Sequence, residues 1–173
     1  MIKPIVLYPD PRLKKQSLPV EKFNEELVKL SVDMIDTMNQ AAGVGLAAVQ
    51  IGELIRMMVM NVNYESDDKE GVVLCNPEIL ETNGTELSEE GCLSIPNVRE
   101  EIERALEVKV RAYDLQGKEK IWVFKNLLAR CIQHEIDHMN GQLFIEKIPA
   151  MRRLVIQPQL KQLKKKFSKE IVF

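Results

Sequence analysis

The sequence contains no apolar run close to the roughly 20 residues that a membrane-spanning helix needs, which argues against an integral membrane protein. It contains only three cysteines in 173 residues, and these do not form the spaced pairs of a disulfide framework. It also lacks a basic excess, since its formal net charge is −2, and this argues against sequence-specific or general nucleic-acid binding. We therefore expect an intracellular globular protein whose cysteines are core residues or take part in chemistry.

Internal repeats and low-complexity linkers are also absent. The length is enough for one domain with a hydrophobic core and too short for two comfortable ones. A content of 45% hydrophobic and 29% charged residues is ordinary for a globular protein. We therefore predict one domain that covers residues 1–173.

The first half of the chain predicts a helix and two strands after an irregular start. Four prolines within residues 1–20 favour an extended, irregular segment. Apolar residues recur at helical spacing over residues 24–38, and Asn24 is a plausible N-cap. The apolar run 55–62 predicts a buried strand, and strand-like residues resume at 72–75.

The second half predicts a hairpin followed by a helix. Residues 106–112 alternate between apolar and polar types, as in a half-exposed strand. A turn signal at 114–117 lets residues 121–124 pair back on that strand. A helix then runs from a possible cap at Asn126 to about Asn140, where a glycine follows.

The final segment, residues 151–173, predicts a lysine-rich helical tail. Its apolar residues follow helical spacing, and Pro158 marks the point where this helix begins or kinks. Strands that frame a central helix, with further helices near both ends of the chain, indicate an α+β fold.

The sharpest chemical signal is the sequence QHEIDH at residues 133–138, which holds both histidines of the chain. His134 and His138 lie four residues apart, so on a helix they share one face, about 6 Å apart along the axis, and can bind one divalent ion. Glu135 can meet an activated water as a general base. Asp137 lies about 100° from His138 around the helix, which favours a supporting or surface role. The alternative is a solvated helix whose histidines are incidental.

A catalytic metal site usually has three protein ligands and one open position, so a third ligand is needed. Cys131 lies on the same helix, but about 10 Å along the axis from His138, and we interpret it as a buried helix-face residue. Cys75 lies in an apolar strand pattern that is typical of a core residue. Cys92 follows Gly91, which lets the backbone approach closely. Spacing alone leaves the choice between Cys92 and a carboxylate open.

A glycine segment at residues 43–48, GVGLAA, superficially matches the dinucleotide fingerprint G-x-G-x-x-A. That fingerprint requires a preceding strand and a following helix, whereas here a helix pattern precedes it. We interpret the segment as closely packed backbone that can pair with an extended peptide. Gln50 follows it and can donate to a developing oxyanion, the alternative being a surface or core-bridging glutamine.

Three stretches together, residues 43–50, 90–94 and 133–138, resemble the three signature motifs of the peptide deformylase family, in the family's order and at similar separations. The resemblance extends to YPDPRL at residues 8–13 and GQLF at residues 141–144, so it covers nearly the whole chain. It implies an α+β fold in which strands surround a central helix with both histidines. It also implies a single catalytic domain with N-terminal and C-terminal helices.

The resemblance implies a metal-dependent hydrolase that removes the formyl group from N-formylmethionine of nascent polypeptides and releases formate. The positions that match the family's metal ligands are Cys92, His134 and His138. Glu135 matches the acid/base, and Gln50 with the backbone N–H of Leu93 matches the groups that stabilise the oxyanion. The positions that match peptide- and methionine-binding residues are Gly43, Val44, Gly45, Leu46, Gly91, Arg130 and Cys131, with Arg99 at the pocket rim.

The resemblance also implies the cofactor, the partners and the compartment. The cofactor is one divalent metal ion, Fe(II) in the cell, which zinc, nickel or cobalt can replace. The partners are N-formylmethionyl nascent peptides, and the compartment is the bacterial cytoplasm. The lysines of the tail are compatible with a contact to the ribosome or with a solvated helix face that caps the fold. They are Lys161, Lys164, Lys165 and Lys166.

A few positions depart from the family's commonest pattern. Ala42 stands where some members place a glutamate that faces the pocket arginine, so the resemblance does not fix the role of Arg99. Asn126 occupies a position that is often glycine, and Val49 occupies one that is often proline. None of these positions is a proposed metal ligand.

Two rival functions fit part of the pattern. One is a zinc peptidase that uses a carboxylate as its third ligand and cuts unformylated peptide bonds. The other is a non-catalytic protein that binds peptide N-termini. A complete ligand set together with Glu135 argues against the second, because binding alone requires neither.

Overall fold

A computed structural model describes residues 1–66 and 71–170 of the chain. The helices are α1 (Glu25–Gln40), α2 (Asn126–Met139) and α3 (Ala150–Glu170), with 3-10 turns η1 (Pro11–Lys14), η2 (Ala48–Ile51) and η3 (Phe144–Glu146). The strands are β1 (Gly45–Ala47), β2 (Met57–Asn61), β3 (Gly71–Asn83), β4 (Glu86–Cys92), β5 (Ile95–Arg104), β6 (Glu107–Tyr113) and β7 (Glu119–Lys125).

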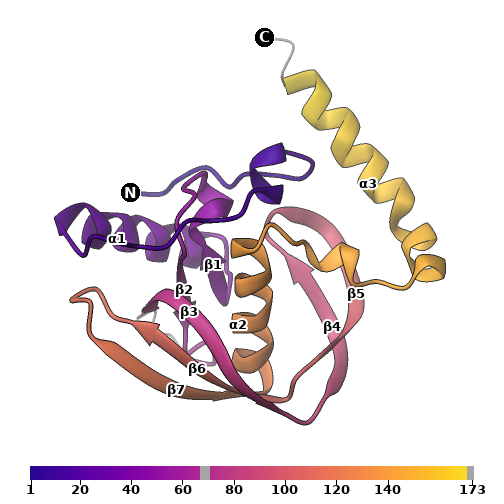
Figure 1. The fold of residues 1–173 in the computed structure, drawn as a ribbon. Coiled ribbons are helices and arrows are strands. Elements are labelled where there is room, and N and C mark those ends of the chain that lie inside the picture. The colour runs from indigo at the N-terminus through magenta and orange to yellow at the C-terminus, as the bar shows by residue number, and fades with distance from the viewer. Residues whose placement is uncertain (67–70, 171–173) are drawn as a thin grey trace.

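The strands form two antiparallel units around α2. One is a five-stranded sheet in the order β1-β2-β3-β6-β7, and the other is the β4–β5 hairpin. In Figure 1, α2 lies between the sheet and the hairpin, α1 lies beyond β1 and β2, and α3 lies on the outside of the molecule. Ile156 and Leu160 of α3 are buried in a cluster that also contains Val6 from the start of the chain. The α+β expectation, with strands around a central helix, is confirmed.

The first four residues of β2, Met57 to Met60, are apolar because the strand is covered on both faces. All five of its residues are buried. Met58 and Met60 pack with residues of α2, whereas Met57 and Val59 pack with residues of α1. A strand between two helices cannot show the apolar–polar alternation of a half-exposed strand, so the continuous apolar run at 55–62 correctly predicted a buried strand.

Helix α1 has the predicted N-cap and ends in a motif that usually contains glycine. The Asn24 side chain accepts from the N–H of Leu27. At the other end, the N–H of Gly43 donates to the Met38 carbonyl and the N–H of Ala42 to the Asn39 carbonyl, a Schellman motif. Ala42 occupies its left-handed position with φ +53°, where a Cβ is unfavourable.

Replacing Ala42 with glycine should therefore raise the free energy of unfolding by about 0.5–1 kcal/mol, because the strain of the Cβ exceeds the added chain entropy. Urea unfolding followed by circular dichroism measures this change. The matched control is Ala41→Gly, since Ala41 has φ −85° and should lose stability on the same substitution. A lower stability for Ala42→Gly would contradict the strain argument.

The structure differs from the sequence predictions in several elements. Strands β1, β4 and β5 were not predicted, and β3 extends beyond 72–75 to Asn83. The N-cap of α2 is Lys125, and Asn126 is instead the first helical residue, at φ +53°. Asparagine tolerates this left-handed region better than most residues other than glycine.

Helix α3 begins well before Pro158, which was expected to mark either its start or a kink. It starts at Ala150, and Pro158 lies inside it. The last three residues of the predicted tail, 171–173, lie outside the described part of the chain. Among the described helices, none combines the length and apolar character that crossing a membrane requires.

Candidate active site

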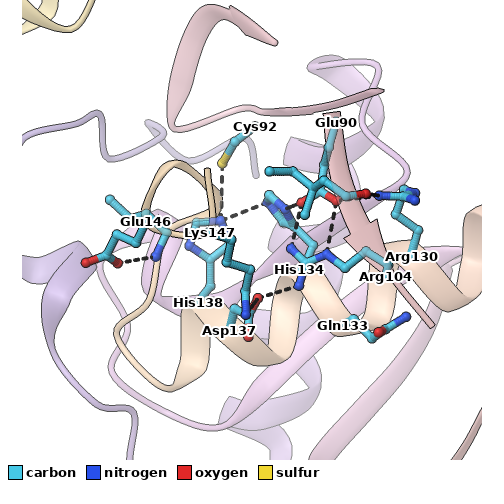
Figure 2. A network of polar contacts seen from close by, with 12 residues as sticks. Glu90, Cys92, Arg104, Arg130, Gln133, His134, Asp137, His138, Glu146 and Lys147 are labelled. Atoms are coloured by element: carbon cyan, nitrogen blue, oxygen red, sulfur yellow. Dashed lines mark hydrogen bonds and ion pairs between the residues drawn. The ribbon is translucent and has the colours of Figure 1, made fainter. Parts of the chain in front are cut away.

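Three side chains from two distant parts of the chain converge beside α2. The Cys92 Sγ lies 3.2 Å from His138 Nε2, which in turn lies 3.1 Å from His134 Nε2. All three potential ligand atoms lie within 4.8 Å of one another. Figure 2 shows the cysteine sulfur directed at the two imidazole rings. One thiol sulfur and two imidazole nitrogens this close to one another suit a single metal ion.

The local structure explains how each potential metal ligand reaches this point. His134 and His138 are one helical turn apart on the face of α2 turned to the hairpin. Cys92 is the last residue of β4, directly before a two-residue turn that leads to Ile95 of β5. The hairpin therefore presents its turn to the helix, and the cysteine at its end meets both rings.

A buried carboxylate fixes one of the two imidazoles. Glu90 Oε1 lies 2.5 Å from His134 Nδ1, so this ring donates through Nδ1 and keeps its Nε2 lone pair for the site. Arg104 donates twice to the same carboxylate, at 2.7 and 3.1 Å, and Arg130 donates at 3.1 Å. Arg104 also pairs with Asp137, as Figure 2 shows, so Asp137 has the supporting role that its angle around the helix indicated.

This network keeps Glu90 ionised. Burial alone would raise the pKa of Glu90, but hydrogen bonds from His134 and Arg104 outweigh it and hold the pKa well below the ordinary value. An ionised carboxylate that is fixed by two guanidinium groups is a rigid acceptor for the imidazole N–H. The His138 ring is not fixed in the way that the His134 ring is, since its Nδ1 has no hydrogen-bond partner among the described residues.

Glu135 is buried beside the donors, with its carboxyl group at the cavity. Only 4% of its surface is exposed, and Oε2 has no partner among the residues the structure describes. Burial raises the pKa of Glu135 to about 7. A carboxyl group with a pKa near neutrality can both accept and return a proton, which suits a general acid/base.

The Gln50 carboxamide has one fixed orientation. Its Oε1 accepts from the N–H of Ala47 at 2.8 Å, and because that backbone group only donates, the opposite atom must be the nitrogen. This Nε2 donates to Ser94 Oγ at 3.2 Å and lies 3.7 Å from Cys92 Sγ. The sequence left Gln50 open between an oxyanion donor and a core-bridging residue, and the structure places its N–H₂ group beside the three converging donors.

A cavity of about 460 Å³ opens in front of these groups. Most of the residues that the sequence assigned to catalysis or peptide binding line it. These are Gly43, Val44, Gly45, Gln50, Gly91, Cys92, Leu93, Arg99, Arg130, Cys131, His134 and Glu135. Leu46 does not line it, because this side chain lies fully buried in the core cluster that includes Met34 and Met38.

Comparison with known proteins gives the site a family context. The polypeptide deformylase family model matches residues 2–154. The peptide deformylase of Acidobacterium capsulatum is 44% identical over 95% of this chain and 97% of its own length, and that of Brucella suis is 44% identical over 94% and 93%. A crystal structure of the Legionella pneumophila peptide deformylase has a TM-score of 0.89 at 43% identity and covers 97% of this chain and 98% of its own.

The chain belongs to the polypeptide deformylase family. The fold agrees across large evolutionary distances, since a plant peptide deformylase superposes with a TM-score of 0.93 at 34% identity over 99% of this chain and 94% of its own. Close structural agreement at this identity means that differences at single positions, such as residue 42, can be interpreted against a common backbone.

The Arg99 side chain pairs with Glu89 at the mouth of the cavity. Position 42 carries alanine, and the Arg99 Nε instead donates to Glu89 Oε1 at 2.6 Å. Both side chains are exposed at the cavity mouth. The guanidinium also lies over the backbone of Gly91, where the Cβ of any other residue would approach its Nη1 to 3.1 Å. Arg99 and Glu89 together therefore form one wall of the opening.

The two other cysteines do not belong to the group of candidate metal ligands, which is Cys92, His134 and His138. Cys75 is fully buried in the core, and burial raises the pKa of its thiol to about 12, so it stays protonated. Cys131 lines the cavity, and its Sγ faces Gly45 so closely that a Cβ there would lie 2.4 Å from it. Glycine at position 45 is therefore needed for β1 to approach α2.

Sequence reasoning missed Glu90 and Arg104, although both are almost fully buried beside the donors. A signal for them existed in the alternation of the hairpin. Along β5, every second residue from Val98 to Arg104 is buried, and two of these buried positions are charged. A charged residue at an inward-facing position next to reactive groups indicates a buried ion-pair network.

Proposed function

We propose that Cys92, His134 and His138 hold one divalent metal ion and that Glu135 serves as the acid/base of the site. The observation that carries this proposal is the convergence of one sulfur and two imidazole nitrogens within 4.8 Å, with Glu135 at the same cavity. A three-ligand site leaves a position for water or substrate. As a family member, the protein is a hydrolase that removes the formyl group from N-formylmethionine of nascent polypeptides.

The donor set also fits the proposed metal. Two imidazoles and one thiolate suit Fe(II), zinc, nickel and cobalt, and not magnesium or calcium, which prefer oxygen ligands. We propose Fe(II) as the ion in the cell. When bound, such an ion acts as a Lewis acid that makes water nucleophilic near neutral pH and polarises the formyl oxygen.

The protein's own groups then carry the proton and the charge. The water oxygen bonds to the formyl carbon while Glu135 takes a proton from that water. The formyl oxygen becomes an oxyanion. The Gln50 Nε2 and the N–H of Leu93 donate to that oxyanion. Glu135 passes the proton to the amide nitrogen as the carbon–nitrogen bond breaks. The products are formate and a free methionine N-terminus.

The substrate is proposed to bind as an added strand. Within the five-stranded sheet, β1 pairs only with β2, so its other edge faces the cavity that Gly91 of β4 also lines. Backbone groups at Val44, Gly45 and Gly91 would pair with the peptide, and Gly43, Cys131 and Arg130 would border the methionine side chain. Arg130 would act mainly by fixing the pocket, because its guanidinium already binds Glu90 and the Ile102 carbonyl.

Formate release tests the proposed function directly. Anaerobically purified protein with one equivalent of Fe(II) should release one formate for each molecule of a formyl-Met peptide that it converts. The same protein should leave the unformylated peptide intact, which separates a deformylase from a zinc peptidase. Cleavage of an internal peptide bond, or binding without formate release, would support one of the rival functions.

The buried network predicts an effect on metal affinity. Replacing Glu90 with glutamine removes the charge that fixes the Nδ1–H of His134 and leaves Arg104 without its main partner, so metal affinity should fall about 10–100-fold. Competition with a colorimetric chelator measures this affinity. The matched control is Glu89→Gln, which changes the exposed neighbour. Equal affinities for the two variants would show that Glu90 does not act on the metal site.

The tail suggests a further partner. We propose that the exposed lysines of α3 contact ribosomal RNA, the alternative being a solvated helix face. Replacing Lys161, Lys165 and Lys166 with alanine keeps the buried Leu160 of the same helix. The triple variant should bind ribosomes more weakly. The slope of log K against the logarithm of the salt concentration should decrease in magnitude by about one for each phosphate contact that is lost. Unchanged binding in a pelleting assay would leave the solvated face as the explanation.

A further inference from the structure

Residues 6–8, at the start of the chain, bind both of the segments that carry the proposed oxyanion donors. The N–H of Val6 donates to the backbone carbonyl of Gln50 at 2.7 Å. The N–H of Tyr8 donates to the backbone carbonyl of Ser94 at 2.8 Å. Gln50 belongs to η2, and Ser94 lies in the turn that directly follows Cys92 and Leu93. One short segment therefore connects the two walls of the site.

The segment is also held from its outer side. The Val6 side chain is buried in a cluster that includes Ile156 and Leu160 of α3, and Tyr8 packs against the same cluster. The Lys164 Nζ lies 5.8 Å from the centre of the Tyr8 ring. Residues 6–8 are thus fixed between α3 and the site, and cannot shift without breaking apolar contacts.

The Gln50 amide also links these two walls directly. Its Nε2 donates to Ser94 Oγ at 3.2 Å and lies 3.7 Å from Cys92 Sγ. That nitrogen must turn one of its hydrogens toward the oxyanion during the reaction. A link through the side chain alone would let the Gln50 amide and the Leu93 N–H move relative to each other. The backbone hydrogen bonds from residues 6–8 fix the separation of the Gln50 amide and the Leu93 N–H without occupying either of these groups.

We propose that Val6 and Tyr8 are positioning residues, whose backbone N–H groups hold the Gln50 amide and the Leu93 N–H at the separation that one oxyanion requires. The inference rests on the proposed roles of Gln50 and Leu93. Oxyanion donors act on the transition state and tolerate displacements of only about 0.5 Å. Loosening the segment therefore lowers kcat and leaves KM and metal content nearly unchanged.

Two substitutions at one position separate the N–H group from the side chain. Val6→Pro removes the N–H and keeps much of the apolar volume, whereas Val6→Ala keeps the N–H and loses apolar volume. We expect Val6→Pro to lower kcat for formate release about 10–100-fold, with KM within about twofold. Val6→Ala should stay within about threefold of the unsubstituted protein. Equal kcat values for the two variants would overturn the proposal.

A double-mutant cycle distinguishes positioning from a general structural role. In a Gln50→Ala background the donor is already absent, so Val6→Pro should cost less than it does with Gln50 present. A purely structural effect would lower kcat by the same factor in both backgrounds. Formate release by the unsubstituted protein is the reference for every variant, so its absence would refute the proposed function rather than this inference.

Hydrogen exchange decides the matter if Val6→Pro does not fold. A peptide phosphonate, whose tetrahedral phosphorus imitates the attacked formyl carbon, should engage both donors in the unsubstituted protein. Because the donors and residues 6–8 are linked, the phosphonate should slow amide exchange at Val6 and Tyr8, measured by NMR, by about tenfold or more. Exchange rates at these two amides that do not change with the phosphonate would overturn the proposal.

Discussion

Replacing Glu135 with glutamine should lower kcat for formate release by about 10²–10⁴-fold, the usual contribution of a general acid/base. Glutamine keeps the shape of the side chain but can neither take the proton from water nor return it to the leaving amine. Because the carboxyl group lies beside the three donors without being one of them, metal content should remain at one equivalent per chain. Formate release and metal analysis on the same sample measure both quantities.

The control for this substitution is Glu103→Gln, a glutamate that is exposed on β5 and lies outside the cavity. It should keep kcat and metal content. The contrast between the two variants removes any general effect of losing one negative charge. A Glu135→Gln protein that released formate at a rate near that of the unsubstituted protein would show that another group moves the proton.

Replacing Cys92 with alanine should abolish stoichiometric metal binding and, with it, turnover. Changes to groups that only support a metal ligand commonly cost 10–100-fold in affinity, so loss of a ligand should cost at least about 100-fold. Two imidazoles one helical turn apart would remain, and they bind a divalent ion weakly without a third donor. Metal content after gel filtration, together with affinity from chelator competition, measures the loss.

The chain offers two matched controls for Cys92. Cys75→Ala removes a thiol from the core, and Cys131→Ala removes one from the cavity wall, and neither side chain belongs to the converging set. Both variants should keep one equivalent of metal, although Cys131→Ala can change KM for the methionine substrate. Full metal content in Cys92→Ala would rule out the thiolate ligand.

The donors on α2 could be predicted from the sequence because they depend on one local rule. Helical spacing places His134 and His138 on one face, and the structure confirms it. The third donor could not be deduced in this way, because Cys92 reaches the rings only through the β4–β5 hairpin. Its assignment came from the family resemblance, and spacing alone left a carboxylate equally open.

The hairpin itself was missed for an identifiable physical reason. Strand β5 alternates between buried and exposed residues, but Glu100 and Arg104 occupy two of its buried positions. Glu100 is neutralised by Arg152 of α3, and Arg104 by Glu90 and Asp137. A pattern of hydrophobicity treats these positions as exposed, although their charges are paired inside the protein.

Backbone conformation set another limit on prediction. Asn126 was expected to cap α2 through its side chain, since asparagine is a frequent N-cap. Instead it adopts a left-handed conformation, and its N–H donates to the Leu106 carbonyl at 2.9 Å. Leu106 directly precedes β6, so this contact is between residues 20 positions apart in the sequence, and local propensity contains no information about it.

X-ray absorption at the metal edge of the zinc- or cobalt-loaded protein tests the central claim most directly. We expect one sulfur at about 2.3 Å and two imidazole nitrogens at about 2.0–2.1 Å from one ion, with a lighter oxygen donor completing the shell. The sulfur contribution should vanish in Cys92→Ala. A spectrum that nitrogen and oxygen donors fit fully, with no sulfur in the unsubstituted protein, would contradict the account.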